Sequence, residues 1–159
     1  MEEFTVATAS DFEDPGHKAF NVAGVEIGVF LQSGTFYAYE NVCPHRAGPV
    51  CQGRIMPRTL EMLNADRTHN SLQFCKEHSH IVCPWHGLEF DVVTGYHPSS
   101  PHIRLRRIDV AVVDGRVVVR LPDGFASQQI DRISLKAAQA NKVLSASRPT
   151  KDVPDAPKG

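Results

Sequence analysis

The sequence lacks long hydrophobic runs, an excess of charge of either sign, and a signal-like start. No segment approaches the roughly 18 consecutive apolar residues that a membrane-spanning helix needs, so we expect no membrane association. Lys and Arg number 17 and Asp and Glu 18, for a net charge of -1, which excludes the basic composition typical of nucleic-acid binding. The first residues are acidic and lack the positive-then-apolar pattern of a signal peptide. We therefore expect a cytoplasmic protein.

Internal repeats and low-complexity blocks are also absent, which argues against a solenoid or a fibrous protein. A length of 159 residues with 42% hydrophobic residues suits one soluble domain with a core of its own. Hydrophobic residues alternate with polar ones over residues 4–6, 20–31 and 35–39, and again on both sides of Asp114-Gly115, a strong hairpin signal. These patterns predict an all-β domain of antiparallel strands.

The middle and the end of the chain differ from this pattern. Pro57 is suited to the first position of a short helix over Arg58–Leu63, followed by a polar loop over 64–71. A loop is also expected over 96–102. Apolar residues after 125 form one weak helical face, and the Ser-, Pro- and Lys-rich residues from Ser145 onward indicate disorder. We therefore expect residues 125–159 to be a C-terminal extension, first helical and then disordered.

Four cysteines and eight histidines are the unusual feature of the composition. All four cysteines, Cys43, Cys51, Cys75 and Cys83, lie within about 40 residues of one another. In a reducing compartment, clustered Cys beside His indicates metal or redox chemistry before disulfides.

Two short motifs combine one thiol and one imidazole each: Cys43-Pro44-His45 and Cys83-Pro84-Trp85-His86-Gly87. Both follow predicted strands, so their loops can face each other and enclose a metal site. Two Cys and two His would suit tetrahedral zinc, although zinc modules usually repeat one ligand type within a loop. The mixed motifs instead let each iron of a two-iron cluster collect a like pair of ligands across the loops.

At this point the sequence resembles the Rieske iron–sulfur proteins. The resemblance rests on CPHRAGPVCQGRI at 43–55 and CPWHGLEFDVVTG at 83–95, and it extends over about residues 3–122. It implies the Rieske iron–sulfur fold of antiparallel sheets, with a domain over 1–124 and an inserted cluster-binding subdomain over about 42–96. It also implies one Rieske-type [2Fe–2S] cluster as the cofactor.

The resemblance assigns a role to each of the four motif residues. Cys43 and Cys83 would bind the inner iron, and His45 and His86 would bind the outer iron near the surface through neutral imidazole nitrogens. Two ferric ions, two sulfides, two thiolates and two neutral imidazoles carry no net charge. Such a centre is reduced more easily than one with four thiolates.

The second motif also indicates the reduction potential. High-potential Rieske proteins of respiratory complexes have a disulfide-forming Cys, a Ser and a Tyr where this sequence has Trp85, Leu88 and Phe90. Their hydroxyl groups donate hydrogen bonds to sulfur, and these donors are missing here. We therefore expect a potential near about −150 mV, the low end of the Rieske range.

An unusually long segment separates the motifs, because 37 residues lie between His45 and Cys83. Residues 56–80 are therefore an expected insertion, which brings Cys75, His78 and His80. Cys75 and His78 have the spacing of a second C-x2-H motif. A zinc site on these residues with Cys51 is one alternative, and a Cys51–Cys75 disulfide is another. A polar insertion with free thiols is the interpretation that we favour.

The expected function is electron transfer by a non-catalytic component. The oxygenase subunits that resemble this domain carry a larger catalytic domain with a mononuclear iron site, which needs two His and a carboxylate. No histidine follows His102, so we do not expect this chain to be such an oxygenase. The sequence therefore resembles a stand-alone Rieske ferredoxin. It would take electrons from a flavin-dependent NAD(P)H reductase and pass them to a terminal, ring-hydroxylating oxygenase, through transient contacts near His45 and His86. The alternatives are a small Rieske subunit of a nitrite-reductase-type complex, an iron–sulfur sensor, and a zinc-stabilised interaction module.

Overall fold

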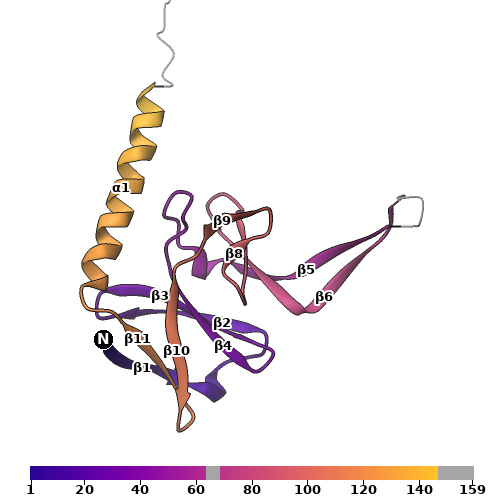
Figure 1. Ribbon diagram of the computed structural model, residues 1–159, viewed down its shortest axis with the longest axis horizontal. Helices are drawn as coiled ribbons and strands as arrows, with labels where there is room; N and C mark the ends of the chain where they lie inside the picture. Colours follow the sequence, from indigo (N-terminus) through magenta and orange to yellow (C-terminus); the bar gives the residue numbers. More distant parts are fainter. Residues whose placement is uncertain (64–68, 147–159) are drawn as a thin grey trace, which may run out of the picture.

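A computed structural model describes the backbone of residues 1–63 and 69–146 and the side chains of residues 1–57 and 78–139. Strands dominate the described part of the chain, and one long helix closes it (Figure 1). This confirms the predicted all-β class. The elements are β1 (Glu2–Thr8), η1 (Ala9–Asp11), β2 (Gly16–Val22), β3 (Val25–Gln32), β4 (Thr35–Glu40), η2 (Val50–Gln52), β5 (Arg54–Leu63), β6 (His69–Val82), β7 (Glu89–Asp91), β8 (Tyr96–His97), β9 (Ser100–Arg104), β10 (Arg107–Val113), β11 (Arg116–Leu121) and α1 (Phe125–Ala146).

A six-stranded antiparallel sheet in the order β1-β11-β10-β4-β3-β2 forms the body of the molecule. Three of its hairpins turn on the two-residue pairs Ala23-Gly24, Ser33-Gly34 and Asp114-Gly115, in which both residues have positive φ. Such turns match the right-handed twist of the strands that they join. The N-terminal strands and the Asp114-Gly115 hairpin were predicted from the sequence and are confirmed.

The sheet curls around a first hydrophobic core. Its edge strands β1 and β2 contact each other. Alternate residues of the strands point inward, among them Ile27, Val29, Ala38 and Val119, all fully buried. Phe125, the first residue of α1, packs into the same core. This core positions β3 and β4, which lead the chain to the first motif.

A second core lies beyond the sheet and contains both motif cysteines. Phe30 and Tyr39 supply its base from β3 and β4, and Ile81 and Phe90 enter it from β6 and β7. The Tyr39 hydroxyl donates a buried hydrogen bond of 2.9 Å to the Val92 carbonyl oxygen. Cys43, Cys51 and Cys83 are part of this core. The motif loops therefore rest on packed side chains, although they lie outside the regular sheet.

The predicted helix over 58–63 is wrong. Residues 54–63 form β5, which pairs with β6 in a long antiparallel hairpin that projects from the body (Figure 1). Pro57 is accommodated because β5 is the edge strand of its sheet, and the register shifts between Pro57 and Arg58. Proline is tolerated at such edges and bulges. Residues 64–68 of the predicted polar loop lie outside the described residues, and residues 69–71 already belong to β6.

Two further differences are smaller. The strand expected over 88–93 is only Glu89–Asp91, because the Asp91 carboxylate accepts hydrogen bonds from the N–H groups of Val93 and Thr94 and so turns the chain. Residues 96–104, expected to begin as a loop, form the short hairpin β8–β9.

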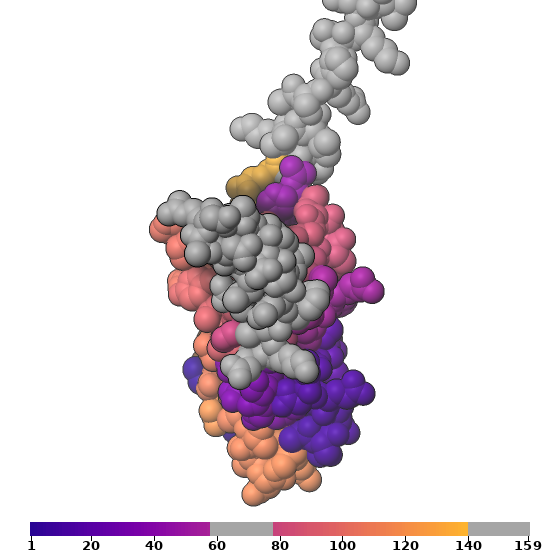
Figure 2. All heavy atoms as spheres, turned by 90° about the vertical axis from the view of Figure 1, so that its right-hand side faces the viewer, coloured from indigo at the N-terminus to yellow at the C-terminus, as the bar shows by residue number. Residues whose placement is uncertain are grey.

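Helix α1 begins where the sequence predicts the extension and leaves the body at one end (Figure 1). Seen from the side of the β5–β6 hairpin, the molecule is elongated, with α1 at one end and the Asp114-Gly115 hairpin near the other (Figure 2). The disorder predicted from Ser145 falls on residues of which 147–159 lie outside the described part. Among the described residues, no helix is both long and apolar enough to cross a bilayer.

Candidate metal centre

The two motif loops share one backbone hydrogen-bond pattern. In each loop the cysteine N–H donates to the carbonyl five residues later, and the cysteine carbonyl accepts from the N–H four residues later. Two loops of different sequence are therefore folded in the same way. The four bonds are Cys43 N to Gly48 O at 2.8 Å, Ala47 N to Cys43 O at 2.8 Å, Cys83 N to Leu88 O at 2.9 Å and Gly87 N to Cys83 O at 2.9 Å.

The structure brings all four predicted ligands together as two like pairs. The cysteines are buried, with Cys43 2% and Cys83 1% exposed. The imidazoles of His45 and His86 are exposed, and their ring centroids lie 4.9 Å apart at 84°. The donor set is thus two inner thiols and two outer imidazoles. This is the arrangement that the resemblance implied, and the assignment of these residues as ligands remains a prediction.

Burial and neighbouring charge shift the ionisation of these groups. Burial raises the pKa of the Cys43 thiol to about 11, and the neighbouring Cys83 sulfur adds to that rise. Partial burial and the positive groups His86, Arg46 and Lys136 lower the pKa of His45. A metal binds thiolate and neutral imidazole. His45 is therefore already biased to the neutral, metal-binding form, whereas the Cys43 thiol must lose its proton to the entering metal.

Gly48 provides a structural test of whether a cluster suits these loops. A Cβ atom at this position would lie 3.1 Å from the Cys83 sulfur and 2.9 Å from the Trp85 ring. The first loop therefore approaches the second so closely that only glycine fits, and it keeps the space beside the Cys83 sulfur free of side chains. The residues fit a [2Fe–2S] group held between the loops. At Gly87, in the second loop, an added Cβ would meet no other atom, and its positive φ is the reason for glycine.

This arrangement of donors is less suitable for a single metal ion. Among the described side chains, no three from His, Cys, Asp and Glu are grouped closely enough to hold one ion. A zinc module would need three or four such donors around one centre, whereas a two-iron cluster needs two on each iron. The donor geometry therefore favours the cluster over the zinc alternative.

The other cysteines and histidines are placed differently. Cys51 is a free, fully buried thiol, so the alternative of a Cys51–Cys75 disulfide is not formed. Burial raises its pKa further. His80 is buried and lies 3.2 Å from the Glu89 carboxylate, and His78 is exposed. The Cys75 side chain, which the second-zinc hypothesis also needs, lies outside the described residues.

Asn41 is a supporting residue that the sequence analysis missed. Its side-chain oxygen accepts a buried hydrogen bond of 2.8 Å from the Cys51 N–H, which ties the far end of the first loop to the end of β4. Asn41 is 4% exposed. A polar residue immediately before Val42-Cys43, at the end of an apolar strand, was the available signal.

Comparisons with known proteins agree with this geometry. The Rieske [2Fe-2S] domain family matches residues 2–109. The ferredoxin component of the alkene monooxygenase system of Xanthobacter autotrophicus is 24% identical over 119 residues, which span 75% of this chain and 81% of that protein.

Two solved structures extend the comparison. The ferredoxin of carbazole 1,9a-dioxygenase from Nocardioides aromaticivorans has a TM-score of 0.54 and 25% identity, over 77% of this chain and 100% of its own. A putative NADH-dependent nitrite reductase small subunit from Mycobacterium tuberculosis has a TM-score of 0.56 and 16% identity, over 76% of this chain and 96% of its own. The chain therefore belongs to the Rieske [2Fe-2S] domain family, and its cofactor is one Rieske-type [2Fe–2S] cluster.

Proposed function

We propose that this protein is a one-electron carrier, a Rieske ferredoxin. It receives electrons from a flavin-dependent NAD(P)H reductase and delivers them to a terminal oxygenase that hydroxylates aromatic rings. The observation that carries the proposal is the arrangement of the two loops, with thiols buried and imidazoles exposed at the same tip. A redox group held there is anchored in the core and still accessible to a partner protein.

Each ligand pair has a separate task in this proposal. Cys43 and Cys83 would hold one iron from the buried side, and His45 and His86 would hold the other from the exposed side. When bound, the cluster takes up and releases a single electron. The protein contributes by fixing these ligands, by excluding water from the thiol side and by setting the potential. The exposed imidazoles, with the 58% exposed Trp85 beside them, offer the contact surface for electron exchange.

The relatives support the choice of partners. One is the ferredoxin component of an alkene monooxygenase system and the other is the ferredoxin of a carbazole dioxygenase. Carbazole is aromatic, which favours a ring-hydroxylating acceptor, and an alkene-oxidising acceptor is the second candidate. Likeness to the nitrite reductase subunit supports the fold alone, since the identity is 16%. The proposed carrier acts in the cytoplasm, without nucleic acid or membrane partners.

The deciding experiment is anaerobic purification, reduction with dithionite and EPR spectroscopy. We expect a rhombic signal with the low average g value of mixed Cys and His ligation, and iron as the bound metal. A colourless protein that contains zinc, and that gives no signal after reconstitution with iron and sulfide, would instead establish the zinc-stabilised module. Turnover with NADH, a flavoprotein reductase and either an aromatic or an alkene oxygenase then separates the two acceptors.

A further inference from the structure

Helix α1 lies beyond the part of the chain that matches the family. The family match ends at residue 109, and α1 spans Phe125–Ala146. Its first two turns are fixed to the sheet. Phe125 is buried in the first core, and the Gln129 side chain makes two hydrogen bonds of 2.9 Å with the backbone N–H and carbonyl of Glu26. The helix therefore has a defined direction when it leaves the sheet.

Two arginines reinforce this base. The Arg132 guanidinium pairs with the buried carboxylate of Glu40. Arg106 donates a hydrogen bond of 3.0 Å to Gln128. Both guanidinium groups lie over the Phe125 ring, at 4.3 Å for Arg106 and 5.5 Å for Arg132. Cations at this point are thus held in place before any partner arrives.

A groove of about 290 Å³ separates the next turns of α1 from the first motif loop. We call it the helix groove. Its apolar walls are Val42, Cys43 and Pro44 on the loop and Leu135 on the helix. Leu135 is 63% exposed, so an apolar side chain faces solvent beside the metal centre.

The helix groove is also strongly basic. Arg104, Arg106, Arg132 and Lys136 line it, and Glu40 is its one carboxylate. Because Glu40 is 2% exposed and already paired with Arg132, it does not neutralise the rest. Among the described residues, no carboxylate forms an ion pair with Arg104, Arg106 or Lys136.

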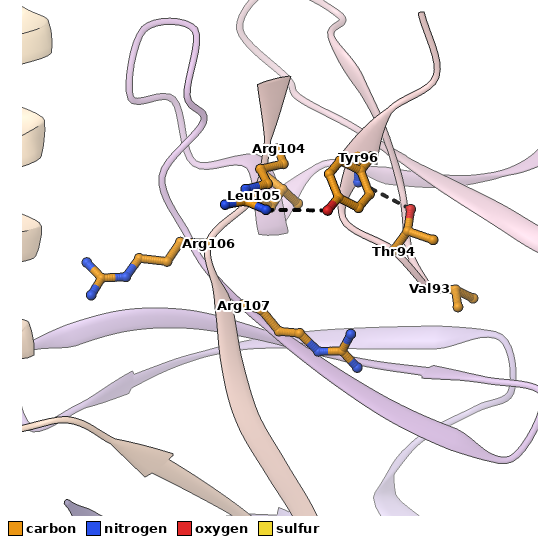
Figure 3. A pocket seen from close by; sticks show the side chains of 7 residues that line it. All are labelled: Val93, Thr94, Tyr96, Arg104, Leu105, Arg106 and Arg107. Carbon is orange, nitrogen blue, oxygen red and sulfur yellow. Dashed lines mark hydrogen bonds between the residues drawn. The ribbon is translucent and has the colours of Figure 1, made fainter. Parts of the chain in front are cut away.

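The positive surface continues past the groove. Arg104 and Arg106 also line a second, open hollow of about 710 Å³, where Arg107 joins them (Figure 3). Arg106 points toward α1 and Arg107 points to the opposite side, while Arg104 donates to the Tyr96 hydroxyl at 3.3 Å (Figure 3). Arginines of segment 104–107 therefore line both hollows. A partner with acidic side chains would meet complementary charge across this whole face.

We propose that the helix groove is a docking site for an acidic segment of a redox partner protein, one that places an apolar side chain against Leu135 and Pro44 and carboxylates against Arg104 and Lys136. The proposal rests on the proposed function, because the groove is useful only if a partner must be held beside the cluster. Cys43 forms part of the groove wall, and the charge of Lys136 acts on His45. A segment bound here is therefore adjacent to the ligands on which electron transfer depends.

The test uses the full-length, cluster-loaded protein and a synthetic peptide of about ten residues that contains several Glu and two Leu. Binding is followed by fluorescence anisotropy. We expect saturable binding at low ionic strength that weakens about tenfold or more near 0.2 M salt, since screening acts on exposed charges. Lys136→Glu and Arg104→Glu should each weaken binding about tenfold, because each replaces an attraction to the acidic peptide by a repulsion between like charges.

Matched controls make the test specific. Arg116→Glu, which makes the same change of charge at the far hairpin, should alter the affinity less than twofold (Figure 2). Leu135→Ser should weaken the Leu-containing peptide but not a Glu-Ser peptide. Because Leu135 and Arg104 are exposed, these variants are expected to fold.

The proposal would be overturned if the wild type showed no saturation, if Arg116→Glu weakened binding as much as Lys136→Glu, or if Lys136→Glu left binding unchanged. Tighter binding after removal of residues 147–159 would also overturn it, because the chain's own end would then be the occupant. A dimer dissolved by Lys136→Glu would likewise assign the groove to a second copy. EPR on every sample keeps the two proposals apart. Loss of the wild-type cluster signal refutes the carrier, whereas an intact signal with unspecific binding refutes only the groove.

Discussion

Ala47 and Gly87 occupy equivalent positions in the two cluster loops. Each lies four residues after its cysteine and donates its N–H to that cysteine's carbonyl, and both have left-handed backbones, with φ of 62° for Ala47 and 70° for Gly87. Glycine adopts this region freely, whereas alanine adopts it at a cost of roughly 1–2 kcal/mol. The first loop is thus the more strained of two otherwise similar turns.

Exchanging these residues should therefore have opposite effects. Gly87→Ala should lower the free energy of unfolding by about 1 kcal/mol, and Ala47→Gly should leave it unchanged or raise it by up to about 1 kcal/mol, because relief of strain is offset by the greater entropy of the unfolded glycine. Chemical denaturation of the cluster-loaded variants measures both. Equal destabilisation by both substitutions would contradict the equivalence of the two turns.

The ligand assignment predicts a sharp difference among three buried cysteines. Cys43→Ser and Cys83→Ser should abolish or severely reduce the visible absorption and the EPR signal, because each removes one of two thiolates on the same iron. Cys51→Ala should retain both, since the Cys51 sulfur hydrogen-bonds to the backbone oxygens of Tyr39 and Glu40 and packs in the second core. Loss of the cluster in Cys51→Ala but not in the other two variants would show that the ligand role had been assigned to the wrong cysteine.

The reduction potential should lie near about −150 mV, at the low end of the Rieske range. Phe90 is fully buried and Leu88 is half-buried against the second core, and neither side chain carries a hydroxyl group that could donate to sulfur. Leu88→Ser and Phe90→Tyr should each raise the potential, because donors to the cluster sulfurs stabilise the reduced state. Spectroelectrochemical titration measures this, and a wild-type midpoint above zero would show that other donors replace these hydroxyl groups.

The buried Cys51 thiol should make the free energy of unfolding depend on pH in the alkaline range. Burial raises its pKa in the folded protein well above the ordinary value near 9. The unfolded thiol therefore loses its proton above about pH 9 while the folded one keeps it, so the unfolded state is favoured as the pH rises. Between pH 9 and 10.5 the free energy of unfolding of the wild type should fall more steeply than that of Cys51→Ala, by about 1 kcal/mol per pH unit. Parallel pH profiles would show that this thiol ionises without unfolding.

The β5–β6 hairpin is predicted to be separable from cluster binding. Arg58 pairs with Cys75, so residues 59–74 can be replaced by Asn-Gly to give a two-residue turn. The shortened protein should keep its EPR spectrum, because Ile81, at the base of the hairpin, remains in the second core. If the inserted residues 56–80 form part of the surface that contacts the natural partner, electron transfer to that partner should fall. Unchanged transfer would exclude that role.

The placement of the four candidate ligands at one tip was predictable because its signal is local. Two short motifs, each with a cysteine, a proline and a histidine, identify these candidates wherever the rest of the chain lies. The meander around β3 and β4 was equally accessible, since its alternation and its turn residues agree. Both depend on neighbours within a few residues.

What the sequence did not reveal depends on distant contacts. Pro57 suits a helix start, but pairing with residues about 20 positions later determines the strand instead. The docking of α1 depends on Glu40 meeting Arg132 and on Glu26 meeting Gln129, pairs that are 92 and 103 residues apart. No local pattern identifies such partners. The helix groove therefore could not be predicted from the sequence.

The division of the interior into two cores has a consequence for local unfolding. Strands β3 and β4 contribute to both cores, whereas the cysteine loops, β7 and the base of β6 pack only into the second. Because cooperative units tend to follow such packing boundaries, the loops can open while the curled sheet stays intact. Amide hydrogen exchange should then resolve two classes of protection, and iron would enter a framework whose sheet is already built.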